Sequence, residues 1–64
     1  MKKYRLCYGD NGKIVYDSDD IVKVFAEKEY NQKIDAINNE KHEYIIFDET
    51  GKTIKKEWHK SLLR

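Results

Sequence analysis

A pattern that occurs twice constrains the fold of this chain more than any other feature. Near each end, an aromatic-rich segment leads through a polar turn ending in Gly-Lys into a second extended segment. The first turn, Gly9-Asp10-Asn11-Gly12, contains the Asn-Gly pair that supplies the positive φ angles of tight hairpins. The second turn is Asp48-Glu49-Thr50-Gly51. The sequence therefore predicts two β-hairpins, over residues 2–17 and 43–58.

Between the hairpins lies one long helical pattern. Ser18 or Asp17 is suited to cap its start, and Asn38-Asn39 can end it because Asn tolerates the left-handed conformation. We therefore predict a helix over residues 19–38. Its apolar residues fall at spacings of three and four, which predicts one stripe packed on the sheet: Val22, Phe25, Ala26, Tyr30, Ile34 and Ile37. The charged residues are expected on the exposed side, among them Lys23, Glu27, Lys28 and Asp35.

Sixty-four residues are enough for one small domain, here residues 1–64 with a short tail at 59–64. Hairpins pair locally, and a right-handed crossover through the helix favours the strand order 2-1-3-4. The predicted fold is α+β, of the type ββαββ: a four-stranded antiparallel sheet with one helix packed on one face. The strand after the second turn is rich in lysine, which is typical of a sheet edge.

The predicted sheet has more apolar residues than one helix can cover. In the third strand Tyr44 and Ile46 point to one face, whereas Ile45 and Phe47 point to the other, as in a central strand. In the fourth strand, Ile54 and Trp58 share a face, whereas Lys55 and Glu57 are expected to point outward. An uncovered apolar face indicates a dimer interface or a docking site for a protein, and we assign it to Cys7, Val15, Ile45 and Phe47. Alternatively, Leu62-Leu63 folds back over this face, or lysine stems cover it.

A second hypothesis concerns nucleic acid. Binders of nucleic acid combine cations for the phosphates with aromatic rings for the bases. The C-terminal segment carries both kinds of side chain: Lys55, Lys56, Trp58, His59, Lys60 and Arg64. The formal net charge of only +1 argues against a general polyanion binder, so the sequence allows this function without favouring it.

The sequence predicts no catalytic residues, no cofactor and no metal site. The soft metal ligands Cys7, His42 and His59 do not occur at a recurrent ligand spacing. A Cys–His pair would need an oriented base and a water-excluding pocket, for which one helix on one sheet leaves little volume. Cys7 is more simply explained as a small buried hydrophobic residue.

The cellular compartment follows from similar observations. A lone cysteine fits a reducing compartment. The N-terminus lacks the apolar region of a signal peptide, and no stretch reaches the length of a membrane span. We therefore expect a cytoplasmic protein that does not contact membranes.

The sequence as a whole favours a non-enzymatic protein–protein interaction module. We expect a homodimer, because a short chain without a disulfide gains stability by self-association. Such a module would bind a larger protein, for example as a small inhibitor or adaptor of the mobile-element (anti-defence) type. The alternative is a small nucleic-acid-binding or transcription-modulating protein that uses the fourth strand and the tail, and its binding would weaken steeply with salt.

Overall fold

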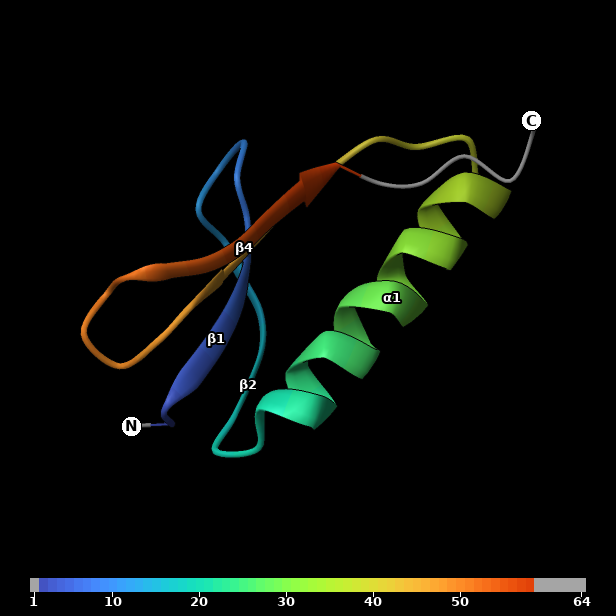
Figure 1. The fold of residues 1–64 in the computed structure, drawn as a ribbon. Helices are drawn as coiled ribbons and strands as arrows, with labels where there is room; N and C mark the ends of the chain where they lie inside the picture. Colours follow the sequence, from blue (N-terminus) through green and yellow to red (C-terminus); the bar gives the residue numbers. More distant parts are fainter. Residues whose placement is uncertain (1, 59–64) are drawn as a thin grey trace.

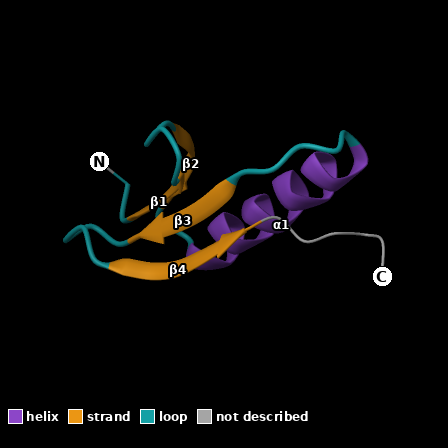
Figure 2. Ribbon diagram, turned by 90° about the horizontal axis from the view of Figure 1, so that it is seen from above, coloured by secondary structure: helices purple, strands orange, loops and turns teal. Residues whose placement is uncertain are grey.

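In the computed structural model, the chain folds into a four-stranded antiparallel sheet with one helix on one face (Figures 1 and 2). The structure describes residues 2–58. Its elements are β1 (Tyr4–Tyr8), β2 (Ile14–Ser18), α1 (Ile21–Ile37), β3 (Glu43–Phe47) and β4 (Thr53–Trp58). The strand order is β2-β1-β3-β4, which confirms the predicted α+β fold.

Both hairpin turns are held by short polar side chains. In the first, the Asn11 side-chain oxygen accepts a hydrogen bond from the Lys13 amide at 2.9 Å, and Gly12 has a φ of 73°. In the second, the Asp48 carboxylate accepts from the Lys52 amide at 2.9 Å, and Gly51 has a φ of 87°. Both glycines stand where the backbone needs a positive φ, so the turn residues define the two hairpins.

The two central strands pair regularly, whereas each edge strand contains a β-bulge. Leu6 of β1 lies opposite Ile46 of β3, and Tyr8 lies opposite Tyr44. On either side of this pair, the register shifts by one residue in β2 and in β4. Val15 and Ile54 are the extra residues, and a bulge of this kind increases the local twist of a strand.

The ends of α1 are set by one aspartate and one asparagine. Asp20 is the N-cap, because its carboxylate accepts a hydrogen bond from the Val22 amide at 2.9 Å. The prediction of Ser18 or Asp17 was therefore wrong by two residues or more, and the Ser18 hydroxyl instead accepts from the Asp20 amide. At the other end Asn39 has a φ of 58°, which confirms the predicted terminator.

The hydrophobic core lies between the N-terminal half of α1 and the middle of the sheet. Four side chains are fully buried: Leu6, Val24, Tyr44 and Ile46. The partly buried side chains of Val15, Tyr16, Ile21 and Phe25 pack against this cluster. Burial of each large apolar side chain contributes about 1.5–3 kcal/mol, so this small cluster supplies much of the driving force for folding.

The face of α1 that packs on the sheet is not the predicted one. The buried residues of the helix are Val24, Lys28, Gln32 and Asp35. Val22, Tyr30 and Ile37, which were predicted to pack on the sheet, are 70%, 59% and 72% exposed. Conversely, Lys28 and Asp35 were predicted to be exposed and are buried. The cause is a set of polar partners on β3 and β4, which hold these side chains through hydrogen bonds and ion pairs.

Candidate functional site

An apolar stripe runs along the outer side of α1. At 3.6 residues per turn, residues 22, 26, 30, 33 and 37 fall within an arc of about 80°. The three large apolar side chains among them, Val22, Tyr30 and Ile37, are mostly exposed. They extend over about 22 Å of helix, since each residue advances 1.5 Å. Single exposed apolar residues are common, but a regular stripe of them is typical of a surface that another molecule covers.

Two charged residues accompany this outer stripe. Lys33 lies within it and Glu29 lies at its margin, and both side chains are exposed. Among residues 2–58, neither of the two takes part in an intramolecular ion pair. The outer stripe therefore offers apolar area together with one available positive and one available negative charge.

The opposite face of the sheet is more sheltered than the sequence suggests. Cys7 is buried, and Ile45 and Phe47 are half-buried. Val15 packs partly buried against the core cluster rather than standing free. The four residues assigned to an interface thus lose much of their exposure within the protomer itself.

Cys7 lies in a setting that does not activate a thiol. Burial raises its pKa, and the positive charge of Arg5 lowers it to a smaller extent. The thiolate is the nucleophilic form, so a raised pKa keeps the sulfur protonated and unreactive.

Nearby carboxylates compensate the cations of β4. The ammonium nitrogen of Lys55 lies 3.9 Å from a Glu57 oxygen, and that of Lys56 lies 3.7 Å from a Glu43 oxygen. Trp58 remains 57% exposed and could stack on a base or pack against a protein. The remaining residues of the predicted basic surface, His59, Lys60 and Arg64, lie outside the described residues, as does the Leu62-Leu63 pair.

A polar joint connects the middle of α1 to β4. Lys28 is only 2% exposed, and its ammonium nitrogen lies 2.5 Å from a Glu57 carboxylate oxygen. The Gln32 side-chain amide donates to the same carboxylate at 3.1 Å and to the Trp58 carbonyl at 2.9 Å. The prediction that Glu57 points outward was therefore wrong, because its carboxylate faces the helix and binds both side chains.

A second polar cluster lies at the C-terminal end of α1. The buried Asp35 carboxylate accepts a hydrogen bond from the Tyr44 hydroxyl and lies 3.1 Å from Nδ1 of His42. The His42 ring stacks on Tyr8, with 4.2 Å between ring centroids and 18° between planes. Glu40 completes the cluster: Asp35, Glu40 and His42 each offer one potential ligand atom, and these atoms lie within 4.8 Å of one another.

Tyr44 acts as a permanent donor in this cluster. Burial raises the pKa of its hydroxyl most, and the hydrogen bond and charge of Asp35 raise it further. The hydroxyl therefore stays protonated at any physiological pH and directs its proton to Asp35.

Sequence reasoning did not find the grouping of Asp35, Glu40 and His42. These residues stand on either side of a helix end, and spacing along a helix says nothing about them. The turn at Asn38-Asn39 reverses the chain so that the Glu40 amide donates to the Asp35 carbonyl at 2.7 Å. A predicted helix terminator between potential ligands was the signal that could have indicated their proximity.

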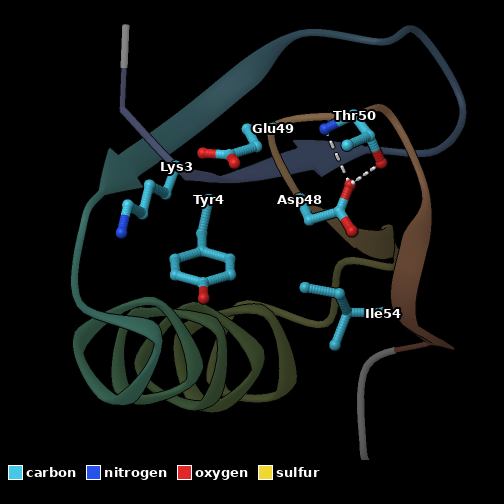
Figure 3. A pocket seen from close by; sticks show the side chains of 6 residues that line it. All are labelled: Lys3, Tyr4, Asp48, Glu49, Thr50 and Ile54. Carbon is cyan, nitrogen blue, oxygen red and sulfur yellow. Dashed lines mark hydrogen bonds between the residues drawn. The ribbon is translucent and has the colours of Figure 1, made fainter.

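An open depression lies at the end of the sheet where β1 begins and the β3–β4 turn passes (Figure 3). It has a volume of about 360 Å³ and is lined by Lys3, Tyr4, Asp48, Glu49, Thr50 and Ile54. Figure 3 shows the Asp48 carboxylate turned toward Thr50, whose amide and hydroxyl both donate to it, at 2.9 and 2.6 Å. This carboxylate is used to build the turn, so the depression gives no reason to assign a reaction to it.

No protein family, curated protein or solved structure matches this chain. Within residues 2–58, no helix combines the length and the apolar content of a membrane span. The surfaces and side-chain clusters described above are therefore the basis for a functional hypothesis.

Proposed function

We propose that the protein is a non-enzymatic protein–protein interaction module that docks through the outer stripe of α1, and that this stripe binds a second copy of the chain. The observation that carries the proposal is the exposure of Val22, Tyr30 and Ile37 on one side of one helix. In a chain this short, so much apolar area in water is a substantial cost that a partner would remove.

A second copy fits the stripe because the stripe is nearly symmetric along the helix. Val22 lies eight residues before Tyr30, and Ile37 lies seven residues after it. In an antiparallel pair with Tyr30 at the two-fold axis, Val22 of one copy meets Ile37 of the other, as a self-complementary interface requires. The same pairing brings Lys33 within one helical turn of Glu29 of the second copy, so the two available charges complement each other.

Dimerisation through α1 leaves the far side of the sheet accessible. That side carries Trp58 together with the half-buried Ile45 and Phe47. Exposed tryptophan is enriched among the residues that dominate binding energy at protein interfaces. We propose that this side binds a larger protein, so that the dimer acts as an adaptor or inhibitor, of the kind that mobile elements encode.

Sedimentation velocity at several protein concentrations tests the dimer. We expect the full chain to pass from monomer to dimer as concentration rises, with little dependence on salt because the contact is mainly apolar. The variant Tyr30→Lys should remain monomeric at every concentration and keep the circular dichroism spectrum of the parent chain.

The matched control is Ile14→Lys, which places the same charge at an apolar residue of β2 that is 51% exposed and lies outside the outer stripe. This variant should dimerise like the parent chain. A parent chain that stays monomeric at its highest concentration, or a Tyr30→Lys variant that dimerises normally, would overturn the proposal.

A further inference from the structure

The C-terminal end of α1 has an excess of negative charge. Asp35 lies in the last turn of the helix and is only 4% exposed. The helix dipole places partial negative charge at this end, where a carboxylate is unfavourable and a cation is favourable. Glu40 adds a second carboxylate nearby. Among residues 2–58, no lysine or arginine forms an ion pair with Asp35 or Glu40.

Burial makes this excess costly. A buried carboxylate needs a cation or several hydrogen bonds to offset the loss of water. The Asp35 carboxylate accepts one hydrogen bond from the Tyr44 hydroxyl and faces one nitrogen of His42. These two partners are those expected for a carboxylate that also binds a metal: one donor that orients it, and one neighbouring ligand atom.

The distances suit a small divalent ion. Ligand atoms 2.0–2.2 Å from a tetrahedral zinc ion lie about 3.3–3.6 Å from one another. The Asp35 oxygen and His42 Nδ1 are separated by 3.1 Å, so a slight widening of this contact would admit the ion. Glu40 is exposed and can move its carboxylate toward the same point, while its backbone is fixed by the hydrogen bond to the Asp35 carbonyl.

We propose that Asp35, Glu40 and His42 bind a divalent transition-metal ion of the zinc type, which would link the end of α1 to the start of β3. Water would occupy the fourth position, as in open sites with three protein ligands. The stacking of His42 on Tyr8 and the Tyr44 hydrogen bond to Asp35 would hold two of the three ligands in place. One imidazole nitrogen favours zinc over magnesium, which prefers oxygen ligands and retains most of its waters.

Titration of the full chain with Zn²⁺, followed by calorimetry and by NMR of the imidazole and amide signals, tests the site. We expect saturation at one ion per chain, with the signals of His42, Glu40 and Asp35 shifting together. The melting temperature should rise with Zn²⁺ concentration, because the ion binds the folded state, whereas Mg²⁺ at the same concentration should have no effect.

Glu40→Gln is the decisive variant, because Glu40 is exposed and the change keeps its shape. We expect its zinc affinity to fall by about tenfold or more. His42→Asn should abolish zinc binding, but it also removes the stacking on Tyr8. If the His42→Asn variant does not fold, the zinc affinity of Glu40→Gln still tests the site. Glu49→Gln and His59→Asn are the matched controls, since they remove an exposed carboxylate of the β3–β4 turn and a histidine that is not among the three proposed ligands, and they should bind zinc like the parent chain.

Two results would overturn the site. One is the lack of saturable zinc binding by the parent chain. The other is binding that is unchanged in Glu40→Gln or lost in His59→Asn, which would place the ion elsewhere. Neither result bears on the dimer, because Asp35 lies on the sheet-facing side of α1, Glu40 and His42 lie beyond the helix, and the two proposals are tested by different variants.

Discussion

The two halves of α1 meet the same sheet in different ways. The N-terminal half contributes Ile21, Val24 and Phe25, which pack with Leu6 in the hydrophobic core. From its middle to its C-terminal end, which we call the polar half, the helix contributes Lys28, Gln32 and Asp35, which reach polar atoms of β3 and β4. Apolar packing is non-directional and scales with the buried apolar area, whereas each hydrogen bond of the polar half requires a donor and an acceptor in a defined geometry.

This difference explains which side of the helix faces the sheet. Apolar packing alone distinguishes the two sides only weakly, because Val24 and Phe25 lie on the sheet-facing side and other large apolar side chains lie in the outer stripe. The opposite rotation would move Lys28 and Gln32 away from Glu57, and Asp35 away from the Tyr44 hydroxyl. Leaving the buried Tyr44 hydroxyl without its partner would cost about 1–3 kcal/mol, so the polar contacts favour the observed rotation. We infer that the polar half sets the rotation, and that the apolar half supplies the burial.

The largest effect is expected in the apolar half. Leu6→Ala removes a fully buried side chain and leaves a cavity, so the free energy of unfolding should fall by about 2–5 kcal/mol. Urea denaturation measures this loss, and Ile14→Ala, at an exposed residue of β2, is the control with little expected change. Equal effects of the two substitutions would contradict the placement of the core.

The polar half should show an asymmetry between the two members of its ion pair. Glu57→Ala leaves the Lys28 ammonium group buried without its carboxylate, and we expect a loss of about 3 kcal/mol in the same assay. Lys28→Met keeps the carbon stem and removes the buried charge, while the partly exposed Glu57 can still reach water, so its loss should be smaller. A Lys28→Met variant that is less stable than Glu57→Ala would refute this account of the joint.

A smaller loss of stability is expected at the C-terminal end of α1, where Tyr44 binds Asp35. Tyr44→Phe removes the hydroxyl that donates to the buried Asp35 carboxylate, and a hydrogen bond to a charged group contributes about 1.5–3 kcal/mol. We expect a loss in the lower part of that range, because His42 still faces the carboxylate. Tyr30→Phe removes an exposed hydroxyl and is the matched control, so a comparable loss in that variant would contradict the prediction.

The smallest effect on stability is expected at the Asp48 hydrogen bonds of the β3–β4 turn. This group is exposed to solvent, so it serves as a reference for the buried polar contacts of α1. The pKa of Asp48 is lowered mainly by its hydrogen bond with Thr50, and further by the Lys52 and Thr50 amides. A lowered folded-state pKa stabilises the turn above the ordinary aspartate pKa, and this contribution is lost as the pH falls through the lower value. Thr50→Val should therefore raise the pKa of Asp48 in an NMR titration and change the stability little. Thr53→Val is the control, and an unchanged Asp48 pKa in Thr50→Val would contradict the prediction.

The sequence predicted the sheet better than the helix surface. Turn residues such as Gly12 and Gly51 act locally, and the alternation of Tyr44, Ile45 and Ile46 marks a central strand, so strand order followed from short-range rules. A helical period, by contrast, shows which residues share a face and not which face meets the sheet. That choice depends on Glu57, which stands 29 residues after Lys28 and comes near it only in the folded chain.

The outer stripe and the Asp35–Glu40–His42 cluster could not be predicted for the same reason: both depend on how distant parts of the chain meet. The apolar stripe of α1 was visible in the sequence, but it was assigned to the core, whereas the structure leaves Val22, Tyr30 and Ile37 exposed. The approach of His42 to Asp35 depends on the reversal at Asn38-Asn39, so the cluster appears only when the helix end and the start of β3 are both in place.

The bulges of the edge strands have a consequence for how copies of this chain can meet. Val15 and Ile54 interrupt β2 and β4 on either side of the regular Leu6–Ile46 pair. A bulge increases the twist of an edge strand, and a twisted edge is a poor template for the addition of a foreign strand. We therefore expect both edges of the sheet to resist the strand-by-strand growth of amyloid-like fibres.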